Sequence, residues 1–159
     1  MPGYICVETP IGPLRVVSDG ESITRVDLPG SVMPSSQEAA ADYPILIEAK
    51  KQLEEYFSGS RNEFDLPLSI IGTPFQMRIW EALREIPFGQ SLNYAEIAAK
   101  AGSPKAVRAA GQANKANKLP IFIPCHRVIG KNQSLTGYAG SKTDLKAILL
   151  EHEKIEFNR

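Results

Sequence analysis

Cysteine and histidine are scarce in this sequence, and long apolar runs are absent from it. Two cysteines and two histidines occur in 159 residues, too few for a disulfide framework and typical of a reducing compartment. No apolar stretch reaches the roughly 18 residues of a membrane-spanning helix, and the opening MPGYICVETPIG lacks the basic segment of a signal peptide. We therefore expect no membrane partner and a cytoplasmic protein, or a nuclear one in a eukaryote.

The net charge of the whole chain is zero, but the charges are unevenly distributed along it. Residues 1–72 contain 5 Lys and Arg against 11 Asp and Glu, a balance of −6, whereas residues 73–159 contain 13 against 7, a balance of +6. A basic half in a neutral chain is typical of a polyanion-binding surface, although the two halves could equally attract each other. With a change of composition at Gly72, this shift predicts two domains, 1–72 and 73–159.

The first half has the pattern of a small sheet and one helix. Runs at 4–9, 14–19 and 22–28 are strand-like and are separated by turn-forming Gly, Pro and Asp-Gly. Residues 30–42 are rich in Ser, Pro and Ala and predict a loop. Apolar residues at helical spacing predict a helix over 44–59 that a glycine ends.

Helix-start signals punctuate the second half. Thr73, followed by Pro74 and Gln76, is typical of a capping box, and Asn93 with Glu96 repeats the pattern. The segments NYAEIAAKAG and SPKAVRAAGQANKAN, in which Ser103 is the expected cap, form a helix-turn-helix signature. A last helix is expected from Ser141.

The second helix of this pair, residues 104–116, has one face of small residues. We expect Val107, Ala110 and Gly111 to face the core, and long polar side chains to occupy another face with alanines between them: Lys105, Ala106, Arg108, Ala109, Gln112, Ala113 and Lys115. Small side chains let a helix come close to a narrow groove, with Arg108 as the long cation among them. The alternatives are a solvated arginine and a helix pair that binds no DNA.

The segment PIFIPCHRVIG, residues 120–130, places a thiol beside an imidazole after a strand-like run. Cys125 could be a packing residue, a metal ligand, a redox thiol or a nucleophile. No CxxC or HxxxH spacing favours zinc, and Cys6 is remote in sequence. A nucleophilic thiol needs a base such as His126, which a carboxylate usually holds; Glu153 lies at the edge of the last helix's apolar stripe. On this hypothesis the thiol is exposed in a pocket.

These motifs together resemble one family. IPCHRVI, preceded by RAAGQANKAN and by IPFGQSLNYAEIAAKAG, resembles the O6-alkylguanine-DNA alkyltransferases over Thr73 to Glu153. The resemblance implies an α+β fold, with an N-terminal ribonuclease H-like α/β domain of a small antiparallel sheet plus a helix, followed by a mostly α-helical domain with a helix-turn-helix. It implies a monomeric DNA repair protein, with cooperativity on DNA left open, that flips O6-alkylguanine out of double-stranded DNA and transfers the alkyl group irreversibly to its own cysteine. No cofactor or metal is expected.

The resemblance also implies residue roles. Cys125 is the alkyl acceptor, His126 activates it through water, Glu153 orients His126, Asn117 holds the turn behind the site, and Tyr94 contacts the flipped guanine. Arg108 replaces the extruded nucleotide in the base stack. The expected DNA-binding set is Tyr94, Lys105, Ala106, Arg108, Ala109, Ala110 and Gln112. The expected substrate pocket is Tyr94, Pro120, Val128, Tyr138, Ala139 and Gly140.

Two departures from the family pattern and two rival functions accompany this hypothesis. Lys118 follows Asn117 where the family has proline, and Ser141 replaces the second glycine of a GYxGG segment, which bears on the accepted alkyl size. The first rival is a non-enzymatic alkyltransferase-like module that only binds lesions; such proteins replace the cysteine that is present here. The second is a cysteine hydrolase, which would turn over repeatedly.

Overall fold

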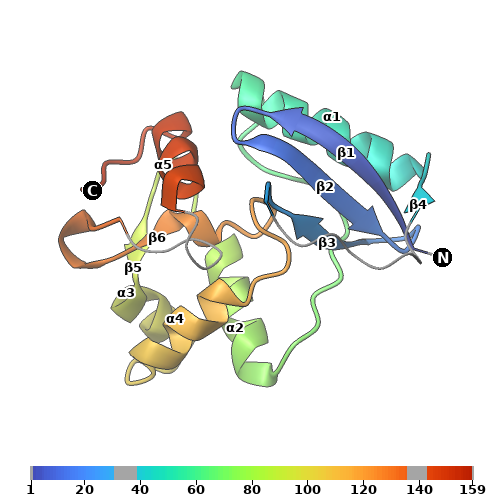
Figure 1. Cartoon of the computed structure of the whole chain (residues 1–159). Helices are drawn as coiled ribbons and strands as arrows, with labels where there is room; N and C mark the ends of the chain where they lie inside the picture. The colour runs from blue at the N-terminus through green and yellow to red at the C-terminus, as the bar shows by residue number, and fades with distance from the viewer. Residues whose placement is uncertain (1, 31–38, 136–142, 159) are drawn as a thin grey trace. The chain divides into compact units, whose positions relative to one another are not determined.

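The computed structural model describes residues 2–30, 39–135 and 143–158. Contacts within the chain divide it into two compact units, Met1–Ile70 (unit 1) and Ile71–Arg159 (unit 2), whose elements are labelled in Figure 1. Unit 1 contains the acidic excess of the sequence and unit 2 contains the basic excess. In the described residues, no helix has the length and apolar character needed to cross a membrane.

Unit 1 consists of a four-stranded sheet and one helix; the sequence pattern predicts the helix and the first three strands, but not the fourth, parallel strand. The sheet has the order β3-β2-β1-β4, with antiparallel pairing of the first three strands and parallel pairing of β4 with β1. The elements are β1 (Gly3–Thr9), β2 (Gly12–Ser18), β3 (Ile23–Asp27), β4 (Ala39–Ala40) and α1 (Pro44–Ser58). Strand β4 falls inside the segment predicted as a loop, whose residues 31–38 are outside the described residues, and pairing with the edge of β1 makes these two residues extended.

Helix α1 packs on β1 and β2, and this contact forms the core of unit 1 (Figure 1). The buried apolar side chains recur every three or four residues on the helix. Together with those of the strands they include Val7, Leu14, Val16, Val17, Leu46, Ala49, Leu53 and Tyr56. The helix ends at Gly59, as predicted, because glycine adopts the left-handed conformation (φ 89°) without strain from a Cβ atom.

Unit 2 is mostly helical, with one two-stranded parallel ribbon. Its elements are α2 (Pro74–Arg84), β5 (Leu92–Asn93), α3 (Tyr94–Lys100), α4 (Val107–Lys115), the 3-10 turn η1 (Cys125–Arg127), β6 (Val128–Ile129), the 3-10 turn η2 (Lys131–Gln133) and α5 (Thr143–His152). Strands β5 and β6 pair with each other. The predicted start of the last helix at Ser141 lies outside the described residues.

Both predicted capping boxes are present. The Thr73 side chain accepts a hydrogen bond from the backbone N–H of Gln76, whose side chain in turn accepts from the N–H of Thr73. Asn93 and Glu96 make the same reciprocal pair at the start of α3. Each box satisfies two backbone donors that a helix start leaves open, so it fixes where α2 and α3 begin.

The second helix of the helix-turn-helix begins later than predicted. Helix α4 starts at Val107, because residues 103–106 form a turn in which the Ala106 N–H bonds to the Ser103 carbonyl (2.9 Å) and no side chain caps the helix. Its buried face is also rotated from the predicted one: Ala110, Ala113 and Asn114 are buried, whereas Val107 is 38% exposed. The Ala113 carbonyl accepts a buried hydrogen bond from the Trp80 indole (2.9 Å), which draws this face towards α2.

Candidate active site

Cys125 opens the 3-10 turn η1, and its two neighbours complete the turn. The Arg127 N–H bonds to the Pro124 carbonyl (3.0 Å), and the Val128 N–H bonds to the Cys125 carbonyl. In a 3-10 turn, successive side chains project about a third of a turn apart, whereas a strand would send Cys125 and His126 to opposite faces. The turn therefore gives all three side chains different neighbours.

The segment before Cys125 is a turn and not the predicted strand. Ile121 has φ 77°, in the left-handed region that a β-branched residue rarely adopts. Asn117 braces this conformation, because its side-chain amide donates to the Ile123 carbonyl (2.8 Å) and its side-chain carbonyl accepts from the Leu119 N–H (2.9 Å). Strain of this kind persists only where surrounding contacts enforce it and is concentrated at functional sites.

The Cys125 residue is 4% exposed, so the expectation of an exposed thiol is wrong. The turn is enclosed because α5 packs against it and because Asn114 of α4 reaches its backbone. The Asn114 amide donates to the Cys125 carbonyl at 3.4 Å. The thiol therefore lies within the packed turn and not on the open surface.

A buried carboxylate joins the next two side chains of the turn. Oε2 of Glu153 lies 2.7 Å from Nε2 of His126, and Oε1 lies 2.7 Å from Nε of Arg127. A second arginine nitrogen, Nη2, bonds to Oε2 at 3.1 Å, so the Arg127–Glu153 pair is bidentate. Two-point pairing fixes the plane of the carboxylate as well as its position. His126 is thus held by a carboxylate that cannot rotate freely.

Backbone groups complete the binding of this pair. Nη1 of Arg127 donates to the Ile86 carbonyl just beyond α2 (2.6 Å), and the Gly89 N–H donates weakly to Oε1 of Glu153 (3.4 Å). Gly89 has φ 84°, and a Cβ atom there would come within 3.6 Å of the Glu153 carbonyl oxygen. The loop after α2 therefore encloses the carboxylate that α5 delivers.

The pKa shifts assign the protons of the His126–Glu153 pair. Burial lowers the pKa of His126 below its usual 6.5; Glu153 acts against this, while Arg127 and Lys146 add to it. Burial raises the pKa of Glu153, but the hydrogen bonds and charges of His126 and Arg127 lower it more, leaving it far below its usual range. At neutral pH the carboxylate is ionised and the imidazole neutral. Nε2 must then donate to Glu153, which leaves Nδ1 as the basic nitrogen.

The predicted DNA-binding residues of α4 and the preceding turn differ in exposure. Lys105, Arg108, Ala109 and Gln112 are exposed and Ala106 is half-buried. Within the described residues, Arg108 makes no ion pair. Ala110 is fully buried against the core of unit 2, so its predicted contact with DNA is corrected, since its methyl group lies inside the protein.

Tyr94 and the cysteine turn both adjoin one face of α4. Tyr94 is the first residue of α3 and half-buried, and a Cβ atom built on Gly111 would lie 3.6 Å from its ring. Asn114, one helical turn after Gly111, bonds to the Cys125 backbone. The glycine thus allows the tyrosine ring to lie close to the helix that also contacts the cysteine turn.

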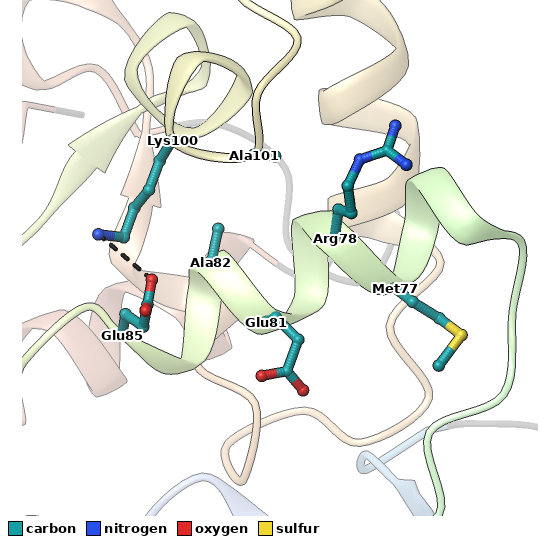
Figure 2. Close-up of a pocket in the computed structure, with 7 residues that line it drawn as sticks. All are labelled: Met77, Arg78, Glu81, Ala82, Glu85, Lys100 and Ala101. Carbon is teal, nitrogen blue, oxygen red and sulfur yellow. Dashed lines mark ion pairs between the residues drawn. The ribbon is translucent and has the colours of Figure 1, made fainter.

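The predicted substrate pocket is only partly within the described residues. Pro120 and Val128 are buried, whereas Tyr138, Ala139 and Gly140 lie outside the described residues. A separate open hollow of about 320 Å³ lies along α2 and the end of α3, where Lys100 pairs with Glu85 at 3.4 Å (Figure 2). It is lined by Met77, Arg78, Glu81, Ala82, Glu85, Lys100 and Ala101, and it contains no member of the cysteine cluster.

Sequence reasoning missed Arg127 and Lys146. Both are buried cations: Arg127 is the last residue of the cysteine turn and holds Glu153, and Nζ of Lys146 on α5 donates to the Val128 carbonyl at 2.6 Å. The signal for Lys146 was present, because it lies three, four and seven residues before Leu149, Leu150 and Glu153 and so shares their helix face. For metals, the described part of the chain contains no group of three His, Cys, Asp or Glu side chains suited to bind an ion.

Comparison with known families covers nearly the whole chain. Residues 3–70 match the family described as 6-O-methylguanine DNA methyltransferase, ribonuclease-like domain, and residues 74–155 match its DNA binding domain. The constitutive methylated-DNA–protein-cysteine methyltransferase of Bacillus subtilis is 55% identical, over 97% of this chain and 96% of that protein. The methylated-DNA–protein-cysteine methyltransferase of Methanosarcina acetivorans is 42% identical, over 94% of this chain and 97% of that protein.

Solved structures from Mycobacterium tuberculosis share the fold of the chain. The O6-methylguanine methyltransferase of that organism is 40% identical, with a TM-score of 0.88 over 97% of this chain and 93% of that one. A second structure from the same organism, in complex with DNA, is 41% identical, with a TM-score of 0.87 over 96% and 92%.

Proposed function

Since this chain belongs to the 6-O-methylguanine DNA methyltransferase family, we propose that it takes the alkyl group from O6 of guanine in duplex DNA onto Cys125. The protein repairs DNA by alkyl transfer to a cysteine, the reaction that its 55% identical relative is named for. The observation that carries the choice of Cys125 is the buried pair of His126, which lies in the same turn as this thiol, with Glu153, at 2.7 Å. The other cysteine, Cys6, is exposed on unit 1, and no such pair is beside it in the described residues.

Activation of the thiol follows from the proton positions of the pair. A free thiol is only a few per cent ionised at neutral pH. Nδ1 of the neutral His126 is the available base, and it takes the thiol proton through a bridging water. The ionised Glu153 stabilises the resulting imidazolium, and Arg127 keeps Glu153 ionised and in place. The product of this step is a thiolate beside an imidazolium.

The transfer itself is a displacement at carbon. The sulfur of Cys125 forms a bond to the alkyl carbon while the bond from that carbon to O6 breaks, and its electron pair stays on the guanine. The guanine regains one proton, which in this proposal the imidazolium of His126 gives up and the hydroxyl of Tyr94 relays. The thioether formed is stable and no residue of the site reverses it, so each chain acts once, without a cofactor.

Access to the alkyl carbon requires the base to leave the helix. Flipping a nucleotide costs a few kcal/mol, and a side chain that fills the vacated stack offsets part of that cost. Arg108 suits this role because it is exposed and has small neighbours, Ala109 among them. Lys105 and Gln112 contact the backbone in this proposal, and Tyr94 contacts the flipped base.

The finer parts of the proposal concern the pocket, assembly and location. In this proposal Pro120 and Val128 line the pocket around the base, the resemblance assigns Tyr138, Ala139 and Gly140, which lie outside the described residues, to the same pocket, and the protein acts as a monomer. We place it in the cytoplasm because its named relatives include bacterial repair proteins and because the site needs a reduced thiol.

Neither rival function fits these findings as well. Alkyltransferase-like modules commonly replace the acceptor cysteine, whereas this chain has Cys125 and is similar over nearly its full length to named methyltransferases. A cysteine hydrolase would release its product and act on many substrate molecules. The relatives are instead named for the transfer of a methyl group to a cysteine of the protein.

The test is the intact mass of the protein after mixing with an excess of an O6-methylguanine duplex. We expect a gain of one methyl group per chain and no further reaction at any excess. Binding without a mass gain would support the lesion-binding module, and repeated turnover of an ester substrate without a mass gain would support the hydrolase.

A further inference from the structure

Glu153 lies one residue beyond the last residue of α5, so the regular helix alone does not set the place of its carboxylate. Two backbone hydrogen bonds close the helix end at this point. The Lys154 N–H donates to the Glu151 carbonyl (3.0 Å), and the Ile155 N–H donates to the Leu150 carbonyl (2.9 Å). This pair of bonds defines a Schellman motif, in which Glu153 is the C-cap residue. We call this turn, with Lys154 and Ile155, the α5 cap.

A lysine occupies the position of the α5 cap at which glycine is usual. Lys154 has φ 59°, in the left-handed region, where a Cβ atom costs free energy that glycine does not incur. The side chain of Lys154 is exposed. Backbone strain of this kind persists only where the surrounding structure enforces it and is concentrated at functional sites, so the contacts that hold the cap are informative.

Ile155 anchors the α5 cap in an apolar cluster next to the cysteine turn. It is 7% exposed, and the other members of the cluster are Ile129, Leu150 and the partly buried Leu135 and Phe157. Ile129 lies on β6, which directly follows η1, the turn that contains His126. One apolar contact therefore joins the two backbone segments whose side chains form the His126–Glu153 pair.

The chain beyond the cap is anchored a second time, on η2 and the residues after it. The Asn158 N–H donates to the Gln133 carbonyl (2.6 Å), and the Leu135 N–H donates to the Asn158 carbonyl (2.6 Å). The Asn158 side chain also donates to the Asn132 carbonyl (2.7 Å). Because η2 follows β6 along the chain, both anchors lie on the segment that begins with the cysteine turn.

We propose that the α5 cap holds the Glu153 carboxylate against His126, with Lys154 and Ile155 as positioning residues that act through Glu153. This inference rests on the alkyl transfer proposed above. The bidentate pair with Arg127 fixes the plane of the carboxylate, and the cap fixes the point on the backbone from which the side chain reaches. Helix ends fray, so a carboxylate at an uncapped end would spend part of its time away from Nε2 of His126, which it now meets at 2.7 Å.

The experiment changes the backbone at position 154 and observes the His126 ring in the protein without DNA. Lys154→Pro removes the N–H that bonds to Glu151 and fixes φ at about −65°, which excludes the left-handed conformation. Lys154→Gly removes the same side chain and charge but adopts that conformation freely. The NMR chemical shifts of the two ring nitrogens report which of them carries the proton, and single-turnover kinetics with an O6-methylguanine duplex report the transfer.

We expect the wild-type protein and Lys154→Gly to share one form of His126, with the proton on Nε2, and to transfer the methyl group at the same rate. Lys154→Pro should show a mixture of ring forms and transfer roughly 10–100-fold more slowly, because the group that orients the base is displaced. A folded Lys154→Pro with the wild-type ring form and rate would overturn the proposal. An equal loss in Lys154→Gly would overturn it as well, since the role would then belong to the lysine side chain.

A second variant serves if Lys154→Pro does not fold. Ile155→Ala keeps the backbone of the cap and removes its apolar anchor, and Ile23→Ala is the matched control, a buried isoleucine of unit 1 that is 0% exposed. Both changes should lower the melting temperature, but only Ile155→Ala should mix the ring forms of His126 and slow the transfer. The same ring form in both variants would contradict the proposal, because Ile155 would then be a core residue without a link to Glu153.

The ring shifts require no methylated DNA, so the two proposals fail separately. A chain in which the cap variants change the His126 ring form, but whose wild type gains no methyl group from the duplex, would contradict the proposed alkyl transfer and leave the role of the cap standing.

Discussion

The two units of this chain bury different kinds of polar group. Among the described residues of unit 1, the buried polar side chains are neutral: Ser18 bonds to the Ser22 carbonyl (2.6 Å), and Gln52 makes two hydrogen bonds to the backbone of Asp65 (2.9 and 3.1 Å). Unit 2 buries ionisable groups within one small region, namely His126, Arg127, Lys146 and Glu153. Neutral groups that are fully hydrogen-bonded stabilise a fold at modest cost, whereas buried charges are rarely a source of net stability.

The two units therefore differ in what their buried polar groups can do. Clustered groups with shifted pKa values are typical of functional sites, and here they surround the one buried thiol. The two units also differ in net charge, because the acidic excess of the sequence lies in unit 1 and the basic excess in unit 2.

The largest effect is expected from Glu153→Gln. The change leaves Arg127 buried with one neutral acceptor in place of a carboxylate and removes the group that orients His126. Breaking a buried pair from one side costs about 3–5 kcal/mol of unfolding free energy, and we expect methyl transfer to fall with it. Denaturant unfolding and single-turnover kinetics measure the two losses; unchanged values for both would contradict the assigned network.

Arg108→Ala tests the basic surface of unit 2. We expect repair of duplex DNA to slow by roughly 10–100-fold, since the vacated stack is worth a few kcal/mol, while reaction with free O6-methylguanine stays near the wild-type rate. Lys115→Ala, an exposed cation on the same helix, is the matched control and should mainly weaken binding. An equal loss on both substrates for Arg108→Ala would exclude its role in base flipping.

Gln52→Leu tests the neutral buried polar groups of unit 1. It leaves the backbone N–H and carbonyl of Asp65 without their side-chain partner, which costs about 1–3 kcal/mol. We expect lower unfolding free energy with an unchanged rate of methyl transfer in the folded protein. A slower transfer in stable preparations would mean that the neutral polar core of unit 1 also serves the chemistry.

The smallest expected effect is a pH dependence of stability that belongs to unit 2. Because the folded-state pKa of His126 lies below 6.5, its contribution is present above that pH and is lost as the pH falls. Glu153, also with a lowered pKa, loses its contribution below about 4.5. Wild-type stability should therefore fall more steeply between pH 7 and 5 than that of His126→Gln, and parallel curves would contradict the assigned protonation.

Local sequence signals predicted the elements that depend on neighbouring residues. The capping boxes at Thr73 and Asn93 and the left-handed stop at Gly59 are fixed within a few residues of chain, and all three are present. The buried face of α4 was mispredicted because a long-range contact decides it, the hydrogen bond from the Trp80 indole to Ala113. The turn at Ile121 was missed although its brace is local, because the Asn117 side chain holds Ile121 in a conformation that its propensity opposes.

The candidate site was likewise only partly predictable from the sequence. The pairing of His126 with Glu153 was expected from the resemblance and from the position of Glu153 on a helix. The burial of Cys125 was not expected, nor were the roles of Arg127 and Lys146, because each depends on how α5 and the loop after α2 close around the turn. Charged residues in an otherwise apolar segment were the available signal, and their partners are distant in sequence.

The most direct measurement locates the transferred group. The protein is treated with a duplex that contains O6-trideuteromethylguanine and is then digested with a protease. The masses of its peptides are measured by mass spectrometry. The account predicts one labelled methyl per chain, on the peptide that contains Cys125, and no label in Cys125→Ala, which should still bind the duplex. A label on Cys6, or a Cys125→Ala protein that still becomes labelled, would contradict it.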